Sequence, residues 1–112
     1  MIIIPTPTQS FASHKVSLAG LTYDFTFRYN TFQGMWYLDI YLNNAAVILG
    51  QALLPTNVLF YGKPIKNFDH GVLMVLRNVD TTEPLGRDNL GVSKLYSLYY
   101  LSNEEWNEIL NG

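Results

Sequence analysis

Side chains alternate between apolar and polar along two consecutive runs of the chain, Thr22 to Tyr29 and Met35 to Leu42. A period of two is typical of half-buried β-strands, because successive side chains point to opposite faces of a sheet. The loop between the runs, Asn30 to Gly34, contains asparagine and glycine, which suit a hairpin connection. The two runs therefore predict an antiparallel hairpin. One face of it carries Tyr23, Phe25, Phe27 and Tyr29, followed by Trp36, Leu38, Ile40 and Leu42.

Two further strands are predicted on either side of this hairpin. Phe11 to Leu18 alternates in the same way and is separated from Thr22 by a short turn that contains Gly20. Ala46 to Leu54 follows the pair Asn43-Asn44, and asparagine tolerates the positive φ angles of a tight turn. This last run is more continuously apolar, which predicts a strand that is buried on both faces.

The second half of the chain is less regular. Pro55 to Gly71 contains one short apolar run, Val58 to Tyr61, which fits either a strand or a helical turn. Gly71 to Arg77 is apolar almost throughout and lacks proline, which predicts a central strand. Asn78 to Gly91 is rich in turn-forming residues and predicts a long loop. Ser93 to Leu101 predicts a last strand with apolar or aromatic residues on both faces.

The end of the chain has a helical pattern. Ser102 and Glu105 stand at the spacing of a capping box, in which each side chain accepts a hydrogen bond from the other residue's backbone N–H. Trp106, Ile109 and Leu110 follow at helical spacing on one face. A short C-terminal helix over about residues 103–111, docked through Trp106, is therefore predicted.

The composition fits one globular domain over residues 1–112. Apolar residues make up 48% of the chain and charged residues only 14%, so that disorder is excluded as the main state and partners are expected to cover part of the surface. Together with the strand pattern, this predicts a mainly β fold: a single small antiparallel barrel or sandwich of about six or seven strands with a short C-terminal helix.

Charge and cysteine content exclude several classes of function. The net charge is −2, and the seven Lys and Arg residues are scattered, so no basic stripe is available for nucleic acid. The absence of cysteine excludes disulfides, thiol catalysis and thiolate zinc sites. The apolar run after Met1 is too short for a signal peptide, and Ala45 to Pro55 is about half of the roughly 20 residues that a membrane helix needs. A soluble protein without a membrane partner is expected.

The two histidines offer little for catalysis. His14 lies between Ser13 and Lys15 on what the alternation predicts to be the exposed face of a strand. His70 follows Asp69 directly, and a carboxylate on the neighbouring residue is not placed across from the imidazole ring as a catalytic pair requires. His70 is therefore interpreted as a loop residue.

The carboxylates and glycines do not form a site either. Asp24 and Asp39 lie on paired strands, but a cross-strand ion pair between Asp39 and Arg28 is a simpler use than acid–base catalysis. The acidic residues between Thr81 and Asn89 do not have the spacing of a calcium loop, and no phosphate-binding glycine pattern is present. The sequence thus predicts no enzyme, no cofactor and no metal.

Aromatic residues are the most unusual feature that remains. The chain has 8 Tyr, 6 Phe and 2 Trp, more than a small core readily encloses, since each buries about 150–250 Å². The core is predicted to contain Phe25, Phe27, Trp36, Leu38 and Ile40. Tyrosines on the opposite faces of the strands are predicted to form a protein interface, because tyrosine provides a large contact area at low entropic cost. These are Tyr37, Tyr41, Tyr96 and Tyr100.

An ordered set of strand motifs also resembles a known family. Tyr23 to Asn30 reads YDFTFRYN and Trp36 to Tyr41 reads WYLDIY. A late LG pair at Leu90-Gly91 precedes a last strand that contains the pair Tyr99-Tyr100. In this order, the motifs resemble the small baseplate plug proteins of contractile-tailed bacteriophages. The turn after WYLDIY, which lacks glycine here, and the C-terminal helix depart from the family pattern.

This resemblance implies a non-enzymatic structural protein of the virion, made in the host cytoplasm and located in the tail baseplate. It would pack in or on the central hub near the tail-tube axis, with hub, spike or tube proteins as partners, and it implies no catalytic residues. One alternative is a carbohydrate- or peptide-binding β module of a phage tail, whose tyrosines would line one concave groove. A second is a small tail-associated hydrolase, which would need a pocket that brings His14 or His70 onto a serine or aspartate.

Overall fold

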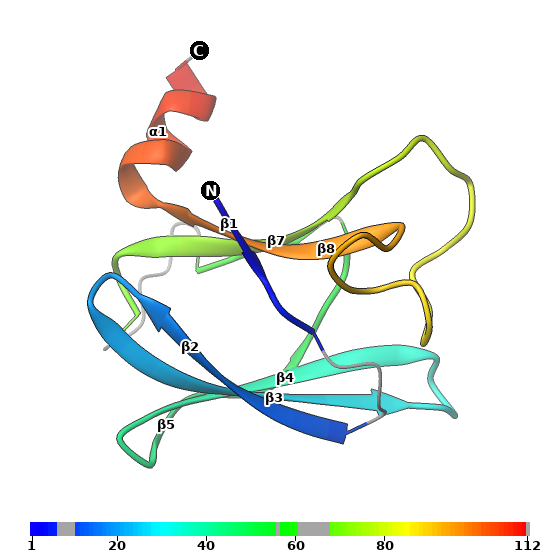
Figure 1. Cartoon of the computed structure of the whole chain (residues 1–112), viewed down its shortest axis with the longest axis horizontal. Coiled ribbons are helices and arrows are strands. Elements are labelled where there is room, and N and C mark those ends of the chain that lie inside the picture. Colours follow the sequence, from blue (N-terminus) through cyan, green and yellow to red (C-terminus); the bar gives the residue numbers. More distant parts are fainter. Residues whose placement is uncertain (7–10, 56, 61–67, 112) are drawn as a thin grey trace.

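The computed structural model describes residues 1–6, 11–55, 57–60 and 68–111. These residues form two four-stranded antiparallel sheets and one helix (Figure 1). The first sheet, which we call the meander sheet, has the order β2-β3-β4-β5, and the second, the β7–β8 sheet, has the order β1-β8-β7-β6. The meander sheet consists of β2 (Phe11–Leu18), β3 (Leu21–Asn30), β4 (Met35–Leu42) and β5 (Ala45–Ala52). The other elements are β1 (Ile2–Ile4), β6 (Val58–Leu59), β7 (Gly71–Arg77), β8 (Tyr96–Ser102) and α1 (Asn103–Asn111).

The meander sheet is the part that the alternation predicted best. β2 and β3 are joined by Ala19 and Gly20, whose φ angles of 53° and 80° are those of the two-residue turn favoured in hairpins. Asn43 and Asn44, with φ of 52° and 66°, make the equivalent turn between β4 and β5. The predicted bounds of β2 and β4 are confirmed, and β3 is longer than predicted by one residue at each end.

The interpretation of β5 as a strand buried on both faces is wrong. β5 lies at the edge of the meander sheet, none of its residues is fully buried, and the Leu49 side chain is 60% exposed. Its pairing with β4 shifts register around Ile40, and Gly50 adopts a φ of +65°. Val47 and Ile48 pack partly against the core, but this irregular edge strand leaves other apolar side chains uncovered.

The β7–β8 sheet was predicted less completely. β7 pairs with both β8 and β6, so its prediction as a central strand is confirmed. β8 begins at Tyr96, not at Ser93, because Ser93 has a φ of +65° and interrupts the extended chain. β1 was not predicted at all. The run from Val58 begins as a strand, β6, and not as a helical turn. Its last residue, Tyr61, lies outside the described residues.

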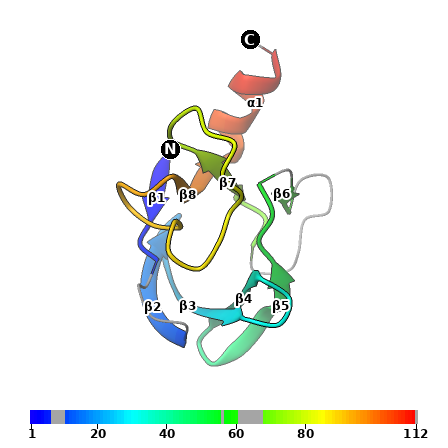
Figure 2. The ribbon, with the colours of Figure 1, turned by 90° about the vertical axis from the view of Figure 1, so that its right-hand side faces the viewer.

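The two sheets stack face to face with the main core between them (Figures 1 and 2). The edge strands β1 and β2 lie on one side of the molecule, and β5 and β6 lie on the other (Figure 2). The mainly antiparallel β fold and the C-terminal helix are confirmed, with eight strands among the described residues. The sheets are not closed into a barrel, since no strand pairing within the described ranges joins one sheet to the other.

The predicted core is confirmed. The side chains of all five predicted core residues are at most 1% exposed. The Trp36 indole, which is buried among them, donates from Nε1 to the Gly86 carbonyl at 3.0 Å, so that its one polar group is paired. The predicted members are Phe25, Phe27, Trp36, Leu38 and Ile40.

Helix α1 begins at the predicted capping box. The Ser102 N–H donates to Glu105 Oε1 at 3.0 Å, and the Glu105 N–H donates to Ser102 Oγ at 3.2 Å. Trp106 is half-buried against the sheet, whereas Ile109 and Leu110 are 58% and 50% exposed. Only the first part of α1 is docked, and the rest extends away from both sheets (Figure 1). No helix in the described part of the chain is long and apolar enough to cross a membrane.

Candidate assembly surfaces

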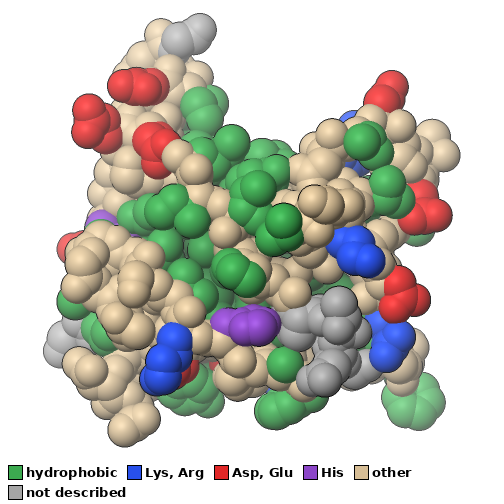
Figure 3. Space-filling model, viewed as in Figure 1, with side chains coloured by type: hydrophobic (Ala, Val, Ile, Leu, Met, Phe, Trp, Pro, Cys, Tyr) green, Lys and Arg blue, Asp and Glu red, His purple; other side chains and the backbone are tan. Residues whose placement is uncertain are grey.

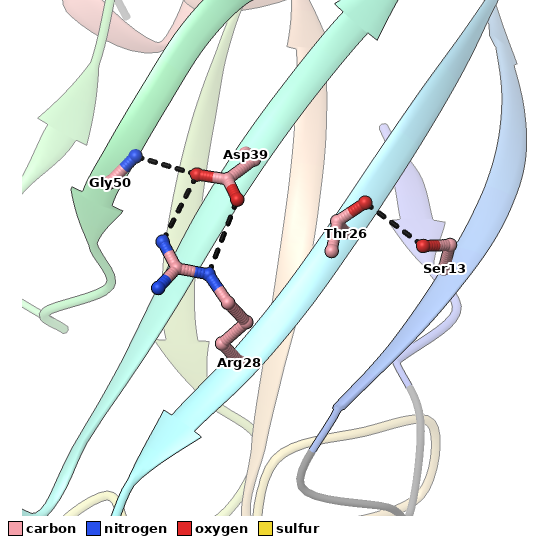
Figure 4. A network of polar contacts seen from close by, with 5 residues as sticks. All are labelled: Ser13, Thr26, Arg28, Asp39 and Gly50. Carbon is pink, nitrogen blue, oxygen red and sulfur yellow. Dashed lines mark hydrogen bonds and ion pairs between the residues drawn. The ribbon is translucent and has the colours of Figure 1, made fainter.

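The outer face of the meander sheet carries polar side chains that pair with one another across the strands. Ser13 Oγ and Thr26 Oγ1 lie 2.9 Å apart, one on β2 and the other on β3 (Figure 4). Lys15 Nζ donates to Asp24 Oδ1 at 3.0 Å between the same two strands. Such cross-strand pairs stabilise a sheet on a face that remains in water. β2 and β3 are therefore joined by side-chain contacts as well as by their backbone ladder.

Asp39 is the centre of the most buried polar contact on this face. Its two carboxylate oxygens accept from Arg28 Nε and Nη2, each at 3.2 Å, and its Oδ1 also accepts from the Gly50 N–H at 2.7 Å (Figure 4). The Asp39 side chain is 13% exposed. The predicted pair between Arg28 and Asp39 is confirmed. Asp24 pairs instead with Lys15, so the two carboxylates have separate partners and do not act together.

Tyr37 and Tyr41 lie on this same outer face of β4 and are partly buried. The Tyr37 ring centre is 6.0 Å from Arg28 Cζ, and its hydroxyl donates to Gln33 Oε1. Next to Tyr37 is an open depression of about 600 Å³ that is also lined by Phe11 and Tyr29. The two tyrosines thus belong to a face that is held in shape by its own polar contacts.

The prediction that Tyr96 and Tyr100 face outward is wrong. Both are 4% exposed and belong to the core between the sheets. Their hydroxyls find partners inside: Tyr96 donates to the Glu83 carbonyl at 2.7 Å and Tyr100 to the His70 carbonyl at 3.2 Å. Because both faces of β8 carry apolar or aromatic side chains, the alternation alone did not identify the inner one.

His70 lies in a bend, as predicted, and its ring joins the two sheets. Its Nε2 is 2.8 Å from the hydroxyl of Tyr23 on β3, and its Nδ1 is 2.8 Å from the hydroxyl of Tyr100 on β8. Because the Tyr100 hydroxyl donates to the His70 carbonyl, we assign the proton to Nδ1, which leaves Nε2 to accept from Tyr23. Burial lowers the pKa of His70, an effect that the charge of Asp69 partly opposes. Burial also raises the pKa of both tyrosines.

The prediction that His14 lies on the exposed face of its strand is wrong, because this residue faces the core. It alternates with Ser13 and Lys15 but shares its side of β2 with the buried residues Val16 and Leu18. Its ring meets Phe27 edge-on with 6.4 Å between the ring centres. Within the described ranges, its Nε2 is buried and has no hydrogen-bond partner.

The outer face of the β7–β8 sheet is apolar, in line with the apolar residues predicted on both faces of its last strand, but its cover by α1 was not predicted. Val72, Met74 and Leu101 lie there, are at most 7% exposed, and pack with Trp106 of α1. Beyond the reach of the helix, side chains such as that of Leu76 are partly exposed, at 38%. The sequence GVLMVLR of β7 already indicated this, because its residues are apolar on both faces of the strand. A strand of this kind needs a second layer over its outer face.

Polar contacts hold the long loop after β7 in shape and join it to β8. The Asn89 side chain accepts from the Gly86 N–H at 2.7 Å and donates to the Pro84 carbonyl at 2.9 Å. Ser97, which is fully buried, donates to the Gly91 carbonyl at 2.7 Å. The described residues contain no group of three or more His, Asp or Glu side chains that could hold a metal ion.

A family model described as Cyanophage baseplate Pam3 plug gp18 matches residues 1–104. The chain belongs to this plug family. The family match includes every strand of both sheets and ends in the first turn of α1. No curated protein sequence matches the chain.

Membership in the plug family confirms the resemblance inferred from the strand motifs. The family is a component of a phage baseplate, so the chain is assigned to the tail baseplate of the virion. Most of α1 lies outside the match, in agreement with the departure from the family pattern noted at the C-terminus.

Proposed function

We propose that this chain is a non-enzymatic structural protein that packs in or on the central hub of a contractile-tail baseplate, near the axis of the tail tube. Its partners would be hub, spike or tube proteins. The observation that carries this proposal is the match of residues 1–104 to the baseplate plug family. The small body, with extents of 37 × 32 × 21 Å, is of a size suited to filling a cavity in a larger assembly.

The outer face of the meander sheet supports this role as an assembly surface. Its charged residues are already paired, Lys15 with Asp24 and Arg28 with Asp39. A partner that covers the face would therefore not leave isolated charges buried. Tyr37 and Tyr41, which stand among these pairs, are the interface residues that we retain from the sequence.

The positions of the histidines support a role without catalysis. Both ring nitrogens of His70 are engaged by tyrosine hydroxyls, and His14 packs against Phe27. Among the described residues, no carboxylate is hydrogen-bonded to either ring. A histidine base is normally oriented by such a partner.

Electron cryomicroscopy of whole particles tests the location. Density for this chain at the tail axis, in contact with hub, spike or tube proteins, is the expected result. Density on the outer baseplate, or its absence from the particle, would overturn the proposal.

A variant tests the interface. Tyr41→Asp introduces a charge at the centre of the proposed contact, so we expect normal folding of the isolated protein and a reduced copy number per particle. Tyr41→Phe, which keeps the ring, is the matched control and should assemble nearly as the wild type does. If Tyr41→Asp is incorporated normally, Tyr41 is not part of the interface.

The depression beside Tyr37 favours a second candidate, a carbohydrate- or peptide-binding β module of the tail. Tyr29, Tyr37 and Phe11 line it together with amide side chains, a composition that suits stacking and hydrogen bonding to a sugar ring. Binding of cell-wall oligosaccharides by the isolated protein, lost in Tyr37→Ala and retained in Tyr41→Phe, would favour this candidate over the plug.

A further inference from the structure

β2 is a long edge strand whose outer side has no partner strand among the described residues. It spans Phe11–Leu18 and lies at the end of the order β2-β3-β4-β5. The two-residue turn after Leu18 makes Leu18 and Leu21 a hydrogen-bonded pair, and such pairs alternate along an antiparallel ladder. Every second residue of β2 therefore directs its backbone N–H and C=O away from β3. These are Phe11, Ser13, Lys15 and Ser17.

The core is incompletely covered along the same side of the molecule. β1 and β2 are the edges of their two sheets on this side, and no strand pairing joins them in the part of the chain that is described (Figures 1 and 2). Ile2 pairs with Tyr100, which faces the core, yet the Ile2 side chain is 47% exposed. Figure 3 shows hydrophobic side chains gathered across the middle of this face. We call the strip of surface between β1 and β2 the edge seam.

His14 gives a second, independent sign that something is missing at the edge seam. Its side chain is on the core-facing side of β2, which borders this strip, and its Nε2 is buried without a partner in the described ranges. A buried polar atom that is left unpaired costs about 1–3 kcal/mol. Because this nitrogen is buried, a strand laid along β2 would pair with it only after the His14 ring turns toward the edge.

We propose that the edge of β2 accepts an extended strand from another baseplate protein, which extends the meander sheet and covers the edge seam. The incoming strand would alternate, with apolar side chains toward Ile2 and His14 and polar ones on the outer face. Addition of a strand to an exposed sheet edge is a recurrent mode of protein recognition, with affinity from the backbone and specificity from alternate side chains. This inference rests on the proposed role in the baseplate.

Lys15 indicates that the added strand is not a second copy of this chain. It lies in the middle of β2, and its side chain is 77% exposed on the outer face. Antiparallel pairing of two β2 strands about their centre would bring the two Lys15 side chains together, and like charges across strands are unfavourable. An acidic residue on the partner strand, opposite Lys15, fits this position instead, because the exposed Lys15 ammonium group can pair with it in addition to Asp24.

The direct test is the structure of the assembled baseplate. We expect a strand from a different protein at the usual spacing of about 4.8 Å from β2, with its backbone bonded to the outward groups of that edge. If the chain lies at the tail axis but the β2 edge is bare, touched only by side chains, or paired with another β2, this inference fails and the proposed function stands. If the chain is not at the hub, the proposed function fails first.

Proline substitution tests the same edge without a structure. Ser13→Pro removes an outward N–H that the fold does not use, and proline is tolerated on edge strands with this orientation. We expect the purified variant to keep a melting temperature near that of the wild type, while its copy number per particle falls about tenfold or more, since its ring obstructs strand addition. Ser13→Ala loses the same hydroxyl contact with Thr26 but keeps the N–H, so it should assemble normally.

Normal incorporation of Ser13→Pro would overturn the inference. Equal losses in Ser13→Pro and Ser13→Ala would overturn it too, because the hydroxyl and not the backbone would then be responsible. Should Ser13→Pro fail to fold, Ser17→Pro provides the same backbone change at another outward residue, with Ser17→Ala as its control.

Discussion

The outer face of the meander sheet carries polar side chains that pair with each other, whereas the outer face of the β7–β8 sheet carries apolar ones. On the first, the cross-strand pair Lys15–Asp24 stands in contact with water, as does much of Arg28. On the second, Val72 and Met74 are buried under Trp106 of α1. Both sheets share one core, but only one of them needs the helix.

This difference shows how a chain with few charges can stay folded and still present a surface for assembly. An apolar outer face must be covered, and here the chain covers part of it with its own C-terminal helix. A polar face whose charges are already paired is stable in water, and covering it later with a partner costs less than covering unpaired charges would. The apolar face is thus expected to matter for folding and the polar face for association.

The largest effect is expected for Trp106→Ala, which uncovers the apolar face. Trp106 packs against Val72, Met74 and Leu101 but is only partly buried, so the loss should lie below that of a fully buried tryptophan. We expect the free energy of unfolding to fall by about 2 kcal/mol. Urea denaturation of the purified protein, followed by tryptophan fluorescence or circular dichroism, measures this.

Ile109→Ala is the matched control for Trp106→Ala. It lies on the same helix but is 58% exposed, so the stability should change by less than about 0.5 kcal/mol. Equal effects of the two substitutions would mean that α1 is stabilised as a whole and not through the tryptophan contact with the sheet.

A smaller effect is expected on the polar face. Asp39→Ala removes the acceptor for Arg28 and for the Gly50 N–H, and these groups can be solvated because both are partly exposed. The expected loss is about 1 kcal/mol. Asp24→Ala, which removes only the exposed pair with Lys15, should cost less than about 0.5 kcal/mol. A loss as large as that of Trp106→Ala would show that the two faces do not differ in the way described.

The meander sheet could be predicted from the sequence because its two faces differ in chemistry. In β3, Phe25 and Phe27 alternate with Thr26 and Arg28, and so the pattern gave the strand, its inner face and the residues of the core. The pair between Arg28 and Asp39 followed from the same register. The alternation carries this information only where one face is polar.

The β7–β8 sheet could not be predicted in the same detail because apolar residues occupy both of its faces. In β8, Tyr99 and Leu101 alternate with Leu98 and Tyr100, and composition does not tell which pair faces the core. β1 was missed because a strand of three residues is too short to show a period. Its place in the sheet depends on β8, which is far away in the sequence.

The candidate surface was predicted in part for the same reason. Tyr37 and Tyr41 alternate with the buried residues Trp36, Leu38 and Ile40, so their outer position could be read from the sequence. Tyr96 and Tyr100 have no such polar contrast around them and were assigned to the wrong face. The edge seam beside β2 was not predictable, because it depends on how two sheets meet.

The smallest effect is expected from pH, at the point where the two sheets are joined. His70 contacts Tyr23 of one sheet and Tyr100 of the other, and burial lowers its pKa below the ordinary value of 6.5, with Asp69 partly opposing. The unfolded chain therefore binds more protons than the folded one between these two pKa values, so stability falls as the pH drops below 6.5 and is unaffected by this group above it.

Protonation would also make Nε2 a donor, so that it no longer accepts from the Tyr23 hydroxyl. Urea denaturation at several pH values between about 5.5 and 8 should thus show a steeper loss of stability for the wild type than for His70→Gln, in which this site does not titrate. The comparison between the two proteins cancels the contribution that their shared carboxylates make to the pH dependence of stability. These include Glu105, whose charge acts on Tyr100. Parallel pH profiles would mean that His70 binds its proton equally well in the folded and unfolded chains, and that the joint between the sheets is not sensitive to pH.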